Sequence, residues 1–148
     1  MSSIRTTLLA SIAGLAIGAL AMNFNGSQAA EPQAEGVYEL RTYTASEGKL
    51  EALEARFKNH TVKLFEKHGM KNIMYWKPTN AEASKNTLIY LLWHKSEEAA
   101  KQSWDAFRKD PDWVAARTES EKDGSLTAKG GVVSVYMKAT DWSPKGIR

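Results

Sequence analysis

The stretch Val37–Met70 constrains the fold of this chain more than any other part of the sequence. It opens with VYELRTYT, in which apolar and polar residues are distributed over two opposite sides at a period of two. Gly48 marks a turn, and a long amphipathic segment follows until Gly69, a residue type that readily takes the left-handed conformation ending a helix. The stretch therefore predicts a strand at Val37–Thr44 and a helix at Glu47–His68.

The rest of the chain supplies three more strands and a second, interrupted helix. Asn72–Lys77 and Thr87–His94 are rich in strand-forming residues, and the polar segment between them predicts a hairpin with a long loop. Ser96–Lys109 begins with a good N-cap, and Asp110-Pro111 stops that helix and starts another. Val132–Lys138 is the last strand. This β-α-β-β-α-β order predicts an α+β fold, the ferredoxin-like sandwich.

The composition of the third strand predicts that the chain pairs with a second copy. Every residue of Leu88–Trp93 is apolar or aromatic, which indicates a strand covered on both faces. The last strand is also apolar on both sides. Two helices cover only one face of a four-stranded sheet, so we expect the sheet of a second chain to cover the other. The sequence therefore predicts a homodimer formed face to face.

The amino-terminal segment predicts export. Arg5 is the only charge before Glu31, Leu8–Met22 is almost wholly apolar, and small residues around Ala29 follow. This pattern is typical of a secretory signal peptide, and the apolar run is short for a spanning helix, although an uncleaved anchor is the alternative. We expect a periplasmic or secreted protein with no stable membrane insertion after cleavage. The chain divides into a signal peptide at 1–29, a flexible leader at 30–36, a domain at 37–140 and a tail at 141–148.

Composition excludes several classes of function. The chain has no cysteine, so disulfides, thiolate metal sites and cysteine nucleophiles are absent. The net charge of +3 falls to +2 once the signal peptide and its Arg5 are removed, and the charges are interleaved along the chain. The aromatic motif of RNA-binding sheets of this topology is missing, as are Gly-rich phosphate loops. We therefore expect no nucleic acid among the partners.

Three motifs together identify a family resemblance. They are YELRTYT at Tyr38–Thr44, EKHG at Glu66–Gly69 and DPDW at Asp110–Trp113, and the likeness extends from Val37 to Met137. In this order and spacing the chain resembles the NIPSNAP family. The resemblance implies a dimeric α/β barrel, a superfamily that includes cofactor-free monooxygenases, haem-handling enzymes and isomerases. NIPSNAP-like chains are also regarded as binding or adaptor proteins, so the fold does not settle the function.

One group of candidate functional residues lies on the first strand. Glu39, Arg41 and Tyr43 share one face of a strand that we expect to be central, where a buried charge must be paired. One interpretation is an ion-pair network within the sheet or across the dimer. The other is a polar floor on which Arg41 holds an anionic or carbonyl oxygen of a ligand and Tyr43 donates a hydrogen bond.

Histidines and strand aromatics give the remaining candidates. His60 and His68 are eight residues apart, which is not the spacing of a helical zinc site, so we predict no metal site. His60 borders the apolar stripe and is a candidate haem ligand, or else a helix histidine that is hydrogen-bonded locally. Tyr75 and Trp93 lie on strands and either line a cavity for a flat ligand or fill the core.

These observations predict an exported homodimer that binds a small, largely apolar molecule between sheet and helices. The predicted ligand-binding residues are Arg41, Tyr43, His60, Tyr75 and Trp93. The sequence requires no cofactor, with haem as an option, and assigns no catalytic residue or reaction. One alternative is a cofactor-free monooxygenase or a haem-dependent oxidoreductase of the dimeric α/β-barrel kind. The other is a pure protein-interaction module without a pocket.

Overall fold

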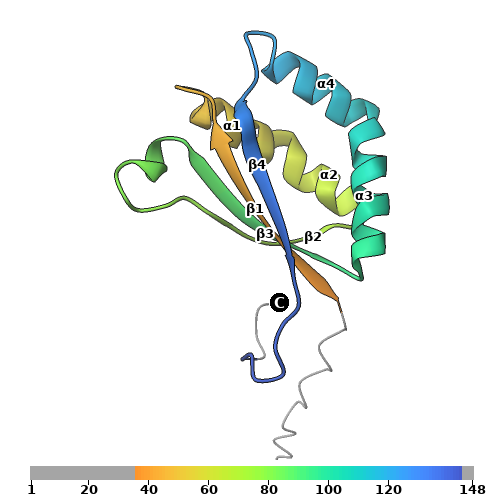
Figure 1. Cartoon of the computed structure of the whole chain (residues 1–148). Helices are drawn as coiled ribbons and strands as arrows, with labels where there is room; N and C mark the ends of the chain where they lie inside the picture. Colours follow the sequence, from red (N-terminus) through yellow and green to blue (C-terminus); the bar gives the residue numbers. More distant parts are fainter. Residues whose placement is uncertain (1–35, 145–148) are drawn as a thin grey trace, which may run out of the picture.

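The computed structural model describes residues 36–144, which form a four-stranded antiparallel sheet with the long helices on one side (Figure 1). The predicted ferredoxin-like α+β fold is confirmed. The strands, in the spatial order β2-β3-β1-β4, are β1 (Val37–Ala45), β2 (Lys71–Trp76), β3 (Thr87–His94) and β4 (Thr127–Met137). The helices are α1 (Leu50–Arg56), η1 (Phe57–Thr61), α2 (Val62–Lys67), η2 (Ala83–Lys85), α3 (Glu97–Lys109) and α4 (Pro111–Ser120).

Part of the predicted domain organisation falls beyond this range. The signal peptide predicted at 1–29 and all but the last residue of the leader at 30–36 lie outside the described residues. The first four residues of the predicted tail, 141–144, are described and are mostly exposed. Within the described range, no helix is both long and apolar enough to span a bilayer.

Local chemistry sets the ends of the helices as the sequence predicts. The hydroxyl of Ser96 accepts a hydrogen bond from the Ala99 amide at 3.1 Å and caps α3. Asp110 caps α4 in the same way, through the amide of Asp112 at 2.8 Å, and Pro111 occupies the first turn. Gly69 ends α2 with a φ of +76°, a conformation that residues with a Cβ adopt only at a cost.

The predicted first helix contains a π-helical turn that periodicity did not reveal. Segments α1, η1 and α2 run on without a break, but in η1 the Val62 amide bonds to the Phe57 carbonyl, five residues back. The Thr61 hydroxyl donates to the carbonyl of Arg56 at 3.2 Å. A π turn holds an extra residue and rotates the later residues of the helix by about 100° around its axis. Thr61 is therefore buried, whereas His60, expected beside the sheet-facing stripe, is exposed on the outer side.

The last strand begins earlier than predicted. We expected Val132–Lys138, but β4 starts at Thr127 and includes both glycines of the Gly130-Gly131 pair. Pairing with β1 shifts register between Tyr43 and Ala45, so the glycines form a bulge. Gly130 has a φ of +71°, and a Cβ on Gly131 would lie 2.7 Å from the Thr44 carbonyl oxygen. The strand was predicted to start directly after these glycines, but in the structure they allow the strand to bend and continue.

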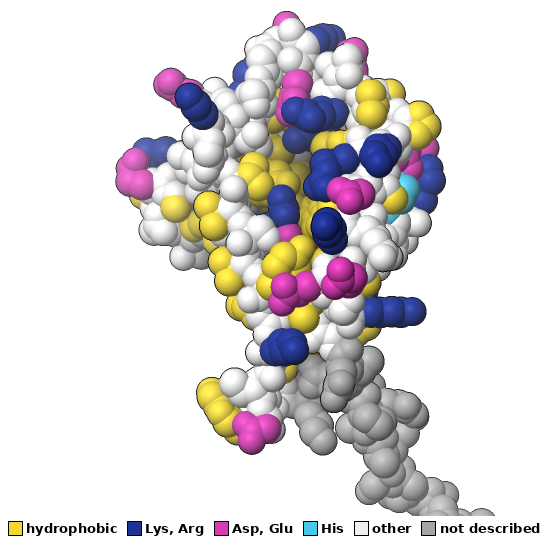
Figure 2. Space-filling view, turned by 45° about the vertical axis from the view of Figure 1, so that its right-hand side comes forward, with side chains coloured by type: hydrophobic (Ala, Val, Ile, Leu, Met, Phe, Trp, Pro, Cys, Tyr) yellow, Lys and Arg dark blue, Asp and Glu magenta, His cyan; other side chains and the backbone are white. Residues whose placement is uncertain are grey.

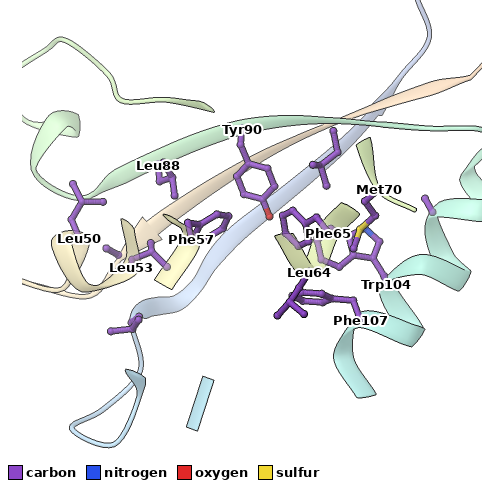
Figure 3. Packing of buried hydrophobic residues seen from close by; sticks show 14 residues of the cluster. Leu50, Leu53, Phe57, Leu64, Phe65, Met70, Leu88, Tyr90, Trp104 and Phe107 are labelled. Atoms are coloured by element: carbon purple, nitrogen blue, oxygen red, sulfur yellow. The ribbon is translucent and has the colours of Figure 1, made fainter. Parts of the chain in front are cut away.

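The hydrophobic core lies between the helices and the sheet (Figure 3). Tyr90, at the middle of β3, is fully buried, and its ring lies 5.1 Å from that of Phe57 and 5.4 Å from that of Tyr75. The Phe65 ring lies 5.2 Å from that of Trp104 and thereby joins α2 to α3. Leu53 and other apolar stripe residues of the first helix are buried here, as the sequence predicts.

No helix of residues 36–144 lies on the opposite face of the sheet (Figure 1), and the side chains on this face are largely apolar. Val133 and Val135 on β4 are 55% and 50% exposed, and Met74 on β2 is 50% exposed. The register of β1 with β3 places Leu40, Ile89 and other apolar residues on the same face. The helices therefore leave one apolar face uncovered, as the sequence predicts, and the partner that covers it remains a prediction.

Candidate functional site

A cleft opens on the helix-facing side of the sheet, between α3 and strands β1 and β4. Pairing of Glu39 with Tyr136 and of Arg41 with Ser134 sets these side chains on one face of the two strands. Helix α3 faces them across a cavity of about 490 Å³. Figure 2 shows a hollow with hydrophobic side chains at its base and charged ones around it. The Glu39 cleft, as we call this cavity, is lined by Glu39, Arg41, Glu97, Glu98, Lys101, Trp104, Arg108, Ser134 and Tyr136.

The carboxylate of Glu39 accepts hydrogen bonds from side chains on four different elements. Its Oε1 accepts from the Arg41 guanidinium at 2.5 Å and from the Ser134 hydroxyl at 2.6 Å. Its Oε2 accepts from the Trp104 indole at 2.7 Å and from His94 Nε2 at 2.9 Å. The Glu39 side chain is only 1% exposed. This carboxylate therefore joins β1, β3, β4 and α3 at one point beneath the cleft.

These contacts keep Glu39 ionised. Burial by itself raises the pKa of the carboxyl, but the hydrogen bonds from His94, Ser134 and Trp104 and the charge of Arg41 together lower the pKa to about 2. An ionised carboxylate only accepts hydrogen bonds, so the proton on His94 Nε2 is the donor in their contact. The other ring nitrogen of His94 is buried and has no hydrogen-bond partner among residues 36–144.

Arg41 is a fixed cation on the floor of the cleft. Burial tends to lower the pKa of its guanidinium, but the tyrosines Tyr90 and Tyr43 and the carboxylate of Glu39 raise the pKa above its ordinary value. The guanidinium lies 4.3 Å from the centre of the Trp104 ring and donates to the Tyr43 hydroxyl at 3.3 Å. With a side chain 14% exposed, Arg41 presents a held positive charge to a molecule in the cleft.

The remaining walls of the cleft combine flat apolar surface with long charged side chains. Trp104 on α3 and Tyr136 on β4 supply aromatic rings. Burial and the nearby Glu39 raise the pKa of the Tyr136 hydroxyl, so it stays protonated at neutral pH. Lys101 and Arg108 bring positive charge from α3, with Glu97 and Glu98 at its amino-terminal end. The arrangement suits a molecule with an apolar body and one or two polar groups.

The structure does not bring the five predicted ligand-binding residues together. Arg41 lines the Glu39 cleft, and Tyr43 touches Arg41 but packs into the core against Phe57 and Tyr90. Tyr75 lines a separate pocket at the β2 edge. His60 lines a groove of about 770 Å³ between the first helix and α4, on the outer side of the helix layer. Trp93 pairs with Tyr38, whose side chain points away from the helices because it alternates with those of Glu39 and Arg41 along β1. Trp93 therefore lies on the face of the sheet opposite the helices.

Sequence reasoning missed most of the cleft. It recognised Glu39 as a charge in need of a partner, but not that His94, Trp104 and Ser134 would meet it from 55, 65 and 95 residues away. Strand alternation is the signal that could have found Ser134, because it places Ser134 across from Arg41 once the strand order is known. Nothing local to Trp104 shows that its indole donates to a carboxylate rather than packing as core.

Comparisons with known proteins agree with this fold. The NIPSNAP family model matches residues 38–144. A structure of a NIPSNAP family protein of unknown function from Agrobacterium tumefaciens is 18% identical, covers 76% of this chain and 96% of its own, and has a TM-score of 0.62. An uncharacterised NIPSNAP-like domain protein from Burkholderia xenovorans is 13% identical, with coverages of 75% and 90% and a TM-score of 0.62.

A more distant likeness is to an enzyme. SnoaB, a cofactor-independent oxygenase from Streptomyces nogalater, is 12% identical, covers 76% of this chain and all of its own, and has a TM-score of 0.51. At this identity the likeness concerns the fold alone. Among curated proteins, no sequence matches the chain.

Proposed function

The chain belongs to the NIPSNAP family, and we propose that it is an exported homodimer that binds a small, largely apolar molecule in the Glu39 cleft. The observation that carries the proposal is the Glu39 carboxylate, held by four side-chain donors at the floor of an open cavity of about 490 Å³. Such a network fixes the position of Arg41 and Trp104 before any ligand arrives. A preorganised site of this kind binds without a further cost of ordering its side chains.

The size and lining of the cleft support a ligand with an apolar body. Its volume falls within the roughly 300–1,000 Å³ typical of small-molecule sites. Trp104 and Tyr136 offer ring surface for the apolar part, and Arg41 offers hydrogen-bond donors for one polar group.

The uncovered sheet face supports the homodimer. Val133, Val135 and Met137 of β4 and Met74 and Trp76 of β2 are each more than a third exposed. Soluble proteins seldom leave a continuous apolar surface of this kind in water. A second copy of the chain presents a matching sheet face by symmetry.

The proposal of export depends on the amino-terminal sequence pattern. Sequencing the amino terminus of exported protein tests whether the mature chain begins after Ala29.

Native mass spectrometry of protein purified from its own exported fraction tests the binding proposal. We expect a dimer of two mature chains, about 26 kDa when scaled from the 16.4 kDa full chain, with a small molecule retained. Lys101→Trp fills the cleft from α3 and should abolish retention. Lys109→Trp is the matched control, because Lys109 lies on the same helix but does not line the cleft. Retention by both variants, or by neither, contradicts the proposed site.

A further inference from the structure

A second, more apolar pocket lies at the opposite edge of the sheet from the Glu39 cleft. It has a volume of about 480 Å³ and is bounded by the first helix, β2 and β3. We call it the β2-edge pocket; it is lined by Glu54, Phe57, Lys58, Val62, Tyr75, Trp76, Lys77 and Leu88. It shares no lining residue with the Glu39 cleft, so it stands independently of the function proposed there.

The π turn of the first helix builds one wall of this pocket. In an α-helix, residues five apart differ in direction by about 140°. Here the Val62 amide bonds to the Phe57 carbonyl, so these two residues follow one another along the same side, and both line the pocket. The Thr61 hydroxyl donates a hydrogen bond to the Arg56 carbonyl at 3.2 Å and stabilises the π turn. Such turns are frequent at functional sites.

The inner surface of the pocket is apolar and aromatic. The ring centroids of Phe57 and Tyr75 lie 6.0 Å apart, and the buried Leu88 also lines the pocket. The Tyr75 hydroxyl donates to the Asn72 side chain at 2.5 Å, so it is already bonded within the chain. The interior of the pocket therefore offers contact surface for an apolar tail and little for a polar group.

The rim of the pocket carries one positive charge in excess. Lys77 pairs with Glu54 at 2.9 Å, which neutralises both. Lys58 is exposed at the rim and has no ion-pair partner within residues 36–144. An apolar slot with a cationic rim is complementary to an amphiphile with an anionic head group. We propose that the β2-edge pocket binds a single-chain carboxylate, with its tail against Phe57 and Val62 and its head near Lys58.

The test uses decanoate, 1-decanol and decylammonium as probes on the full mature protein, with tryptophan fluorescence as the readout. We expect saturable binding with decanoate tightest. Lys58→Glu should weaken decanoate binding about fivefold at low salt, or about 1 kcal/mol, and leave decanol unchanged. Lys63→Glu is the matched control: the same charge change on the same helix, but facing the outer groove. Val62→Phe should weaken all three probes, by about tenfold for decanoate.

Several outcomes would overturn this proposal. One is equal binding of the three probes, or equal effects of Lys58→Glu and Lys63→Glu. Another is decanoate binding that strengthens as the dimer is diluted to monomer, which would show that a second copy occupies the pocket. If the circular dichroism spectrum shows that Val62→Phe does not fold, the comparison of Lys58→Glu with Lys63→Glu alone tests the proposal. Lys101→Trp, which fills the other cleft, should leave decanoate binding intact, so the two sites succeed or fail separately.

Discussion

The two halves of the helix-facing side of the sheet are built in opposite ways. The β2–β3 half is filled by aromatic rings. The centroid of the Tyr90 ring lies 5.1 to 5.8 Å from the ring centroids of Phe57, Phe65 and Tyr75. The β1–β4 half is organised around the charge of Glu39, and an open cavity separates α3 from β4 there. Ring packing closes space without directional demands, whereas a buried carboxylate needs donors at fixed positions. The Glu39 cleft therefore lies in the half where the positions of polar groups decide the packing, whereas the β2-edge pocket lies at the margin of the ring-packed half.

The largest expected effect concerns the ring-packed half. Phe65 is 1% exposed and contacts rings of β3 and α3. Phe65→Ala should lower the free energy of unfolding by about 3–5 kcal/mol, through lost burial and the cavity left behind. Chemical denaturation measures this change. Val114→Ala, at an exposed apolar position on α4, is the control and should stay within about 0.5 kcal/mol. A loss below about 1 kcal/mol for Phe65→Ala would contradict the packing account.

The next effect concerns the charged half. Arg41→Met leaves the buried Glu39 with three of its four donors, and we expect a loss of about 3 kcal/mol, the lower end for breaking a buried ion pair. In a Glu39→Gln background the same substitution should cost clearly less, because no buried charge is then left unpaired. A double-mutant cycle measures this coupling, and strictly additive effects would show that Arg41 does not act through Glu39.

Acid should distinguish the two halves further. The pKa of Glu39 is depressed from 4.5 to about 2, so its contribution to stability is present above about pH 4.5 and is lost as the pH falls towards 2. The free energy of unfolding should therefore fall across that window. Glu39→Gln should flatten the fall, and Phe65→Ala should lower stability by the same amount at each pH. Asp110, whose pKa is lowered by Lys67 and His68, and Glu121, whose pKa is lowered by Arg56 and Arg117, contribute to the part that remains.

The smallest expected effect is at His60. Its side chain is exposed in the outer helix groove and lines neither the Glu39 cleft nor the β2-edge pocket. His60→Ala should change the free energy of unfolding by less than about 0.5 kcal/mol and leave ligand retention unchanged. Differential scanning calorimetry and native mass spectrometry measure these two quantities. Loss of the retained molecule in His60→Ala would move the binding site from the Glu39 cleft to the outer groove.

Sequence patterns predicted what depends on short-range chemistry. Strand alternation correctly put Glu39, Arg41 and Tyr43 on one face of a central strand, and the caps at Ser96 and Asp110 were predicted from residue type. A π turn has no periodic signal of its own, so His60 was expected on the wrong side of its helix.

The grouping of the candidate site residues was beyond the same reasoning. Whether Trp104 packs as core or donates to a carboxylate depends on how α3 docks over β1, which is a long-range outcome. Tyr75 and Arg41 share the helix-facing side of the sheet but lie on strands separated by β3, and so line different cavities. Alternation predicts the face of a sheet, and it does not predict where along that face a cavity remains.

The indole N–H resonance of Trp104 tests the central claim, that the Glu39 cleft is a ligand site, most directly. This N–H donates to Glu39 at 2.7 Å on the cleft wall. Titration with 2-naphthol, a flat and largely apolar probe, should shift the Trp104 resonance saturably in a ¹H–¹⁵N spectrum. The resonance of Trp142, an 80% exposed residue near the carboxyl end, should stay in place. An unmoved Trp104 resonance, or shifts of both resonances that never saturate, would contradict the account.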